Sequence, residues 1–156
     1  MTTPALRFRI AGAGCCLLDY IYAEVDFTAA PFRAWRSHRH GDGGLEPGKL
    51  TFTEDFEAFA GRDLDAVLLE ITAGKPVSAV NVGGPGVVAL IHAAQILDPA
   101  RFAVRFVGAV GADDEGKELC RQLTRTPLSP QGLVIKRGRT PRTVVLSDPH
   151  FDHGRG

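Results

Sequence analysis

The spacing of apolar residues alternates between a period of two and a period near 3.6, as in domains built from both strands and helices. Residues 6–11 form a short apolar run with alternate arginines, which predicts a first strand. Residues 20–27 alternate aromatic or β-branched side chains with polar ones, which predicts a half-exposed strand of the kind that forms a lid. Residues 28–48 show no period, so we expect a long loop there.

Two short helices are predicted before the middle of the chain. Thr51 or Thr53 can cap the first helix, whose opening turn is acidic, and Gly61 ends it. The second helix is expected over residues 64–72, before a Gly-Lys-Pro sequence stops it.

The most informative pattern is a strand that enters a double glycine and turns at once into a helix. Residues 77–82 predict the strand, Gly83 and Gly84 the turn, and Pro85 the start of the helix. The helix places five apolar residues on one face: Val87, Leu90, Ile91, Ala94 and Leu97. Because glycine has no Cβ and the first helical N–H groups are unpaired, such a corner suits a small polar ligand.

The second half of the chain continues the alternation of strands and helices. Residues 102–110 are a continuous β-rich run, which predicts a strand buried on both faces in a parallel sheet. A helix is expected over residues 113–123, with acidic residues in its first turn. Two short strands, about 132–136 and 142–147, flank the turn 137–141. This order predicts a doubly wound α/β layer, with the alternating strands in a small second sheet.

Composition agrees with one globular domain and argues against several classes of partner. The 156 residues are 44% hydrophobic and 23% charged, which is enough to bury a core. Eighteen basic and eighteen acidic residues give no net charge, so we expect neither nucleic acid nor a membrane surface as a partner. No apolar run has the length of a signal peptide, and three cysteines are an odd number, so we expect a cytoplasmic protein.

Histidines occur in two groups that we considered for metal binding: His38 with His40, and His150 with Asp152 and His153. Neither group has helical spacing with a further ligand nearby, so we expect no metal site.

The glycines of an earlier pair, Gly12 and Gly14, follow the first predicted strand and leave a dinucleotide-binding hypothesis open. The third glycine of that fingerprint would fall at Leu17, and no acidic residue ends a strand about twenty residues on. A nicotinamide-dependent protein is therefore the least supported alternative.

Asp19 lies just beyond the carboxyl end of the first predicted strand, which is where open α/β sheets bind ligands. Its carboxylate could accept two hydrogen bonds from neighbouring hydroxyl groups of a sugar. The alternative is an aspartate that only caps a turn.

Three segments, taken in order, resemble the N-terminal signatures of the ribokinase (PfkB) family of carbohydrate and nucleoside kinases. They are residues 12–19 (GAGCCLLD), Gly83-Gly84 at the start of a helix, and residues 108–116 (GAVGADDEG). The long segment between the first two is similar to the adenosine-kinase-like branch. The resemblance covers nearly the whole chain, and the ordered set is far more specific than any one motif.

This resemblance implies a ribokinase-like α/β fold, a doubly wound (Rossmann-like) three-layer sandwich that is truncated here, with a small β-sheet lid over the substrate. It implies two groups of site residues. The expected substrate-binding residues are Asp19, Gly83 and Gly84. The expected turn-shaping residues are Gly111, Asp113 and Gly116.

The resemblance also implies which parts of a kinase the chain has and which it lacks. Residues 20–27, 132–136 and 142–147 would supply the lid. ATP and Mg2+ are implied for the complete family member, but the catalytic base and the ATP site belong to a C-terminal half whose motifs are absent from residues 1–156. The family's asparagine four residues after the second glycine is replaced by Val88, which removes one polar contact.

We therefore expect the N-terminal, substrate-binding portion of an ATP-dependent sugar or nucleoside kinase, without catalytic residues of its own and inactive alone. Two alternatives stay open: a non-catalytic module that binds a small polyol or nucleoside, and one half of a split protein. A truncated sheet exposes an edge and an apolar face, so a homodimer through the lid or the exposed edge is also expected.

Overall fold

The computed structural model describes residues 8–128 and 130–151, and these residues form a mixed α/β fold. Two compact units share the chain. The first unit contains residues 1–20 and 79–145, and the second contains residues 21–78 and 146–156.

A parallel sheet of three strands forms the base of the first unit. Strands β1 (Phe8–Ala13), β4 (Phe102–Gly111) and β5 (Leu133–Lys136) lie in the order β1-β4-β5. Phe8 pairs with Phe102, and Gly108 pairs with Leu133. Parallel neighbours need crossover connections, and here helices α4 (Pro85–Ile96) and α5 (Asp114–Leu123) serve in them.

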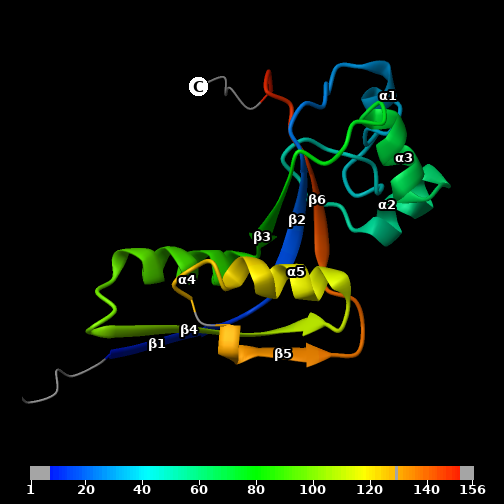
Figure 1. Cartoon of the computed structure of the whole chain (residues 1–156). Helices are drawn as coiled ribbons and strands as arrows, with labels where there is room; N and C mark the ends of the chain where they lie inside the picture. The colour runs from blue at the N-terminus through cyan, green and yellow to red at the C-terminus, as the bar shows by residue number, and fades with distance from the viewer. Residues whose placement is uncertain (1–7, 129, 152–156) are drawn as a thin grey trace, which may run out of the picture. The chain divides into compact units, whose positions relative to one another are not determined.

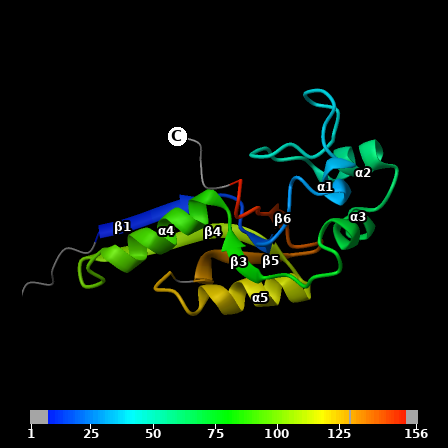
Figure 2. The same cartoon turned by 90° about the horizontal axis from the view of Figure 1, so that it is seen from above.

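Helices α4 and α5 cover the same face of this sheet (Figure 1). Phe106 and Val110 of β4 are buried in one core with Val87 of α4 and Leu119 of α5. Seen from above in Figure 2, α4 lies over β1 and β4, while α5 lies toward β3. Burying a large apolar side chain of this kind contributes about 1.5–3 kcal/mol, so this face holds the unit together.

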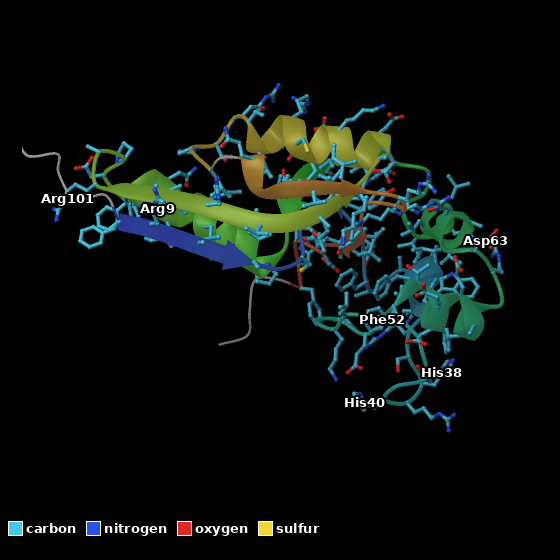
Figure 3. All side chains as sticks on the ribbon, turned by 90° about the horizontal axis from the view of Figure 1, so that it is seen from below. Arg9, His38, His40, Phe52, Asp63 and Arg101 are labelled. Atoms are coloured by element: carbon cyan, nitrogen blue, oxygen red, sulfur yellow. The ribbon has the colours of Figure 1, made fainter. Side chains whose placement is uncertain are left out.

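The opposite face of the same sheet is open in the described part of the unit. Figure 3, seen from below, shows strands of this sheet in front of α4, and Arg9 belongs to β1. Arg105 is exposed, and Val107 and Val134 keep 43% and 51% of their surface accessible. The prediction that residues 102–110 are buried on both faces is therefore wrong, because the described helices of this unit pack on one side only.

A second sheet joins strands β3 (Ala79–Gly83), β2 (Leu17–Tyr22) and β6 (Arg142–Leu146) in the order β3-β2-β6. The strand predicted over residues 20–27 begins three residues earlier and ends at Tyr22.

The segment predicted as a lid strand over residues 132–136 is not in this second sheet. Its strand, β5, follows the 3-10 turn η1 (Pro130–Gly132) and pairs with β4 instead. A methyl group at Gly132 would overlap the carbonyl oxygen of Phe106, and Leu133 packs against the core. A glycine that allows close approach and an inward-facing leucine thus direct the segment along β4, and it forms no hairpin with β6.

Among residues 21–78 and 146–151, the described part of the second unit, there are three helices: α1 (Ala30–Arg33), α2 (Thr53–Ala60) and α3 (Leu64–Ile71). Both α1 and α2 contact α3. Their buried side chains include Phe32, Phe56 and Val67. The predicted loop over residues 28–48 therefore contains a short helix.

The predicted cap of α2 is wrong, although its end is confirmed. Phe52 is the N-cap residue, and no side chain caps the helix by a hydrogen bond. Gly61 ends the helix in the left-handed conformation, with φ of 64°.

Across residues 8–128 and 130–151, every helix is too short or too polar to span a bilayer.

Candidate functional site

The double glycine forms the expected strand-to-helix corner in the first unit. Strand β3 ends at Gly83, Gly84 is the N-cap of α4, and Pro85 is its first residue. Gly84 has φ of 106°, which side-chain-bearing residues rarely adopt. Helix α4 has no side-chain cap and no acidic residue in its first turn. Neither a capping side chain nor an acidic side chain of its first turn therefore compensates the partial positive charge at the N-terminal end of α4.

The carboxylate of Asp19 lies against the α-carbon of Gly83. A methyl group added at Gly83 would overlap Asp19 Oδ2 and would lie 2.5 Å from Leu17 Cδ1. Asp19 belongs to β2, which neighbours β3 in the second sheet. Asp19 and Gly83 are 64 positions apart in the sequence. The structure brings them together, as expected for one site.

Gly84 makes its close contact with a different part of the chain. A methyl group there would lie 2.5 Å from the carbonyl oxygen of Cys15, in the connection between β1 and β2. Packing and the positive φ together explain a glycine at this position. A Cβ at Gly84 would point toward the backbone of Cys15 and Cys16.

Asp19 is half-buried, and this burial raises the pKa of its carboxyl group above the ordinary value. The influence of the Thr143 side chain on β6 lowers the pKa of Asp19 and partly offsets that rise. An ionised carboxylate has about four acceptor positions, so Asp19 has capacity for hydroxyl groups of a ligand. The sequence had not indicated Thr143 as a site residue.

A second strand-to-helix corner contains the turn-shaping residues. Gly111 ends β4, and Asp113 is the N-cap of α5, where its Oδ1 accepts the N–H of Gly116 at 2.9 Å. The same carboxylate accepts the N–H of Thr140 at 2.7 Å and its hydroxyl at 2.6 Å. These two bonds from Thr140, above all the hydroxyl, lower the pKa of Asp113 to about 2.

Glycine is needed on both sides of this second corner. A methyl group at Gly111 would lie 2.5 Å from the carbonyl oxygen of Gly138, and one at Gly116 would lie 3.0 Å from Thr140 Oγ1. The structure therefore brings Gly111, Asp113 and Gly116 together around a threonine that the sequence had not indicated. Its only local sign was a Thr-Pro pair after a Gly-containing turn.

Val88 lies on α4 and packs against the buried core of the first unit. An apolar side chain there contributes to packing, and it offers no hydrogen bond at the glycine corner.

A cavity of about 450 Å3 lies in the second unit, between its long loop and α2. Three of its side chains contact one another: Lys49 Nζ lies 3.3 Å from Glu46 Oε1 and 3.4 Å from His40 Nδ1. Backbone N–H groups, that of Gly44 first, hold the pKa of Asp42 well below its usual value. Figure 3 shows the His40 side chain in this part of the unit.

The dinucleotide-binding hypothesis is wrong for Gly12 and Gly14. That fingerprint needs a helix directly after the glycines, whereas here β1 is followed by β2. Gly12 has a packing role, since a methyl group there would lie 2.9 Å from Leu90 Cδ1 on α4.

The residues described by the structure contain no group of three or more histidine, cysteine, aspartate or glutamate side chains that could hold a metal ion. Of the two histidine groups in the sequence, Asp152 and His153 lie outside the described residues.

No family model matches the sequence, and no curated protein matches it either. Solved structures do match its fold. An adenosine kinase from Schistosoma mansoni, in complex with adenosine, is 19% identical with a TM-score of 0.52, and the match covers 89% of this chain and 35% of that one. A protein assigned as a ribokinase from Agrobacterium tumefaciens is 15% identical with a TM-score of 0.51, and the match covers 92% of this chain and 33% of that one.

The chain thus spans about a third of the length of the solved structures that it matches. At such identities the likeness establishes the fold, and the fold class predicted from the sequence is confirmed. The chain has a ribokinase-like α/β fold over the part that matches.

Proposed function

We propose that the chain is the substrate-binding portion of an ATP-dependent sugar or nucleoside kinase of the PfkB type, located in the cytoplasm. In this proposal Asp19 binds hydroxyl groups of the substrate, and the main chain at Gly83 and Gly84 offers N–H groups beside it. One observation carries the proposal: the Asp19 carboxylate lies against an α-carbon that has no side chain, next to the uncapped N-terminus of α4.

The chemistry of this corner suits a polyhydroxylated molecule. A half-buried carboxylate binds neighbouring hydroxyl groups by charge-assisted hydrogen bonds, which are about twice as strong as neutral ones. Burial adds to the effect, because water competes less for the same acceptors. The matched adenosine kinase holds adenosine, a ligand with such hydroxyl groups, and this supports a nucleoside or sugar as the ligand class.

Phosphoryl transfer depends on groups that neutralise charge on the transferred phosphate, commonly Mg2+ and its ligands. Because residues 1–156 contain none of the motifs to which the resemblance assigns the catalytic base and the ATP site, the chain alone is expected to bind its ligand without ATP-dependent phosphorylation. Phosphorylation of ribose or adenosine by the purified chain would contradict this expectation.

Calorimetric titration of the purified chain with ribose and, separately, with adenosine tests the proposal. We expect binding of one of them, and loss of that binding in Asp19→Asn and Gly83→Ala. Gly14→Ala is the matched control, because a methyl group there meets no atom within 4 Å. No binding of either compound at millimolar concentration, or equal binding by Asp19→Asn, would contradict the proposal.

We also propose that the chain associates through the open face of its parallel sheet, either as a homodimer or with a second polypeptide. The supporting observation is the exposure of Val107 and Val134 on neighbouring strands of that face. Sedimentation equilibrium of the purified chain tests self-association: a dimer that Val107→Lys weakens is expected, and a monomer at all concentrations would contradict the homodimer.

A further inference from the structure

The only asparagine among the 156 residues lies in the middle of a strand, where asparagine is disfavoured. It is Asn81 of β3, two residues before Gly83. Its side chain is exposed, and no residue in 8–128 or 130–151 forms a hydrogen bond with its amide. Neither burial nor a hydrogen bond inside the described fold therefore explains asparagine at this position.

Asn81 projects from the same face of the second sheet as Asp19. The residues on either side of Asn81, Val80 and Val82, pack against the buried core of the first unit, and so do the two neighbours of Asp19. Because side chains alternate along a strand, Asn81 and Asp19 both point to the other face. Gly83 confirms this direction, since its absent Cβ would point at Asp19 Oδ2.

Contacts at both ends of β3, which lies beside β2 (Figure 1), place Asn81 close to Asp19 along the strand as well. Before β3 begins, the N–H of Ser78 donates to the carbonyl oxygen of Ile21 at 2.8 Å. At its end, Gly83 lies against Asp19. Asn81 lies between these two contacts and therefore opposite the segment of β2 that they bracket. Opposite or diagonal positions on antiparallel strands place Cβ atoms about 4.5–8 Å apart, which is near enough to share one ligand.

The two side chains have complementary hydrogen-bonding groups. An ionised carboxylate only accepts, so Asp19 can bind the hydrogen of a hydroxyl group but not its oxygen. The amide of Asn81 has two N–H donors and one carbonyl acceptor. Together they offer an acceptor for the hydrogens of neighbouring hydroxyl groups and a donor for their oxygens.

We propose that Asn81 is a second ligand-binding side chain, which donates its amide N–H to a hydroxyl oxygen of the molecule whose hydroxyl hydrogen Asp19 accepts. This inference rests on the proposed function of the Asp19 corner and adds selectivity to it. A carboxylate alone also attracts cationic groups, whereas an amide donor beside it favours neutral, neighbouring hydroxyl groups.

The first test measures ligand affinity and stability together in Asn81→Val. Calorimetric titration with ribose and with adenosine should show binding that is about three- to tenfold weaker, the effect of losing one hydrogen bond. The variant should nevertheless unfold at a higher denaturant concentration, because valine has the higher β-propensity and the described fold loses no hydrogen bond. A side chain that served only the fold would lower the stability when replaced.

Gln95→Leu is the matched control. Gln95 is an exposed amide in the last turn of α4, ten residues after Pro85, so the helical rise places it about 15 Å from the glycine corner. Its replacement should leave the affinity unchanged. An equal loss of affinity in Gln95→Leu, or unchanged affinity in folded Asn81→Val, would overturn the proposal.

A second test needs no ligand. Asn81→Asp places another carboxylate beside Asp19, so the midpoint of the Asp19 carboxyl titration, followed by NMR, should move to higher pH because like charges disfavour ionisation. Gln95→Asp should leave this midpoint in place. An unchanged midpoint in Asn81→Asp would show that the two side chains are too far apart to share a ligand, and the proposal would fail.

The outcomes separate this inference from the proposed function. Loss of binding in Asp19→Asn together with full binding in Asn81→Val keeps the proposed function and overturns the role of Asn81. No binding of ribose or adenosine by the unchanged chain at millimolar concentration contradicts the proposed function, and the ligand-binding role of Asn81 with it.

Discussion

The first unit contains two strand-to-helix corners that use similar residues in opposite ways. At the corner of α5, Asp113 is satisfied within the chain: it caps the helix and binds both polar groups of Thr140. At the corner of α4, no side chain caps the helix, and the neighbouring carboxylate of Asp19 comes from another strand.

This difference separates a structural aspartate from a candidate binding aspartate. Hydrogen bonds to the charged form lower the pKa of Asp113 to about 2, whereas burial raises the pKa of Asp19. One group stabilises the fold when ionised, and the other has acceptor positions that a ligand can use. A pair of glycines before a helix does not distinguish the two cases, but the partners of the nearby carboxylate do.

The largest effect is expected when the α4 corner is filled. Gly83→Ala would push a methyl group into the Asp19 carboxylate and Leu17, so we expect at least about a tenfold loss of ligand affinity and about 1–3 kcal/mol less stability. Calorimetry and denaturant unfolding measure the two effects. Unchanged affinity in the folded variant would mean that this corner does not contact the ligand.

At the other corner, Asp113→Asn should lower stability at neutral pH. The pKa of Asp113 is depressed in the folded state, so its stabilising effect is present above the ordinary aspartate value of 3.8 and is lost as pH falls through about 2. Melting temperatures of the chain and the variant should therefore differ at pH 7 and converge near pH 2. A constant difference at all pH values would show that the charge is not the cause.

Asp19→Asn should act in the opposite direction on stability. Because the folded pKa of Asp19 is raised, its favourable effect is present below the ordinary aspartate value and is lost as pH rises through the folded pKa. The variant should therefore melt at a higher temperature than the chain at pH 7, while losing the ligand. Scanning calorimetry at pH 7 checks the sign, and a lower melting temperature would count against a desolvated carboxylate.

The smallest effect is expected at Gly14. A methyl group there meets no atom within 4 Å, and the position has no positive φ. The free energy of unfolding of Gly14→Ala should therefore differ from that of the unchanged chain by less than about 0.5 kcal/mol. Denaturant unfolding measures this difference. A loss as large as that of Gly83→Ala would mean that clashes do not explain the difference between these glycines.

Local sequence patterns predicted α4 and α5 well, whereas the short helix α1 fell in a segment predicted as a loop. Pro85 begins α4 as predicted, and α5 ends at Leu123 as predicted. Proline at the first helical position and acidic first turns depend only on nearby residues.

The partners of the strands were harder to predict than the strands themselves. The sheet to which β5 belongs depends on whether Leu133 faces the core, and this requires the position of a distant strand. The Thr140 contacts with Asp113 also join residues far apart in sequence. A period of two predicts a strand but not its neighbour.

The most direct measurement follows the carboxyl carbons of Asp19 and Asp113 by NMR while ribose or adenosine is added at pH 7. A ligand at the α4 corner should shift the Asp19 signal in a saturable way and leave the Asp113 signal in place. A saturable shift of Asp113 with a silent Asp19, or no shift of either signal at millimolar ligand, would contradict the assignment of Asp19 as the binding carboxylate.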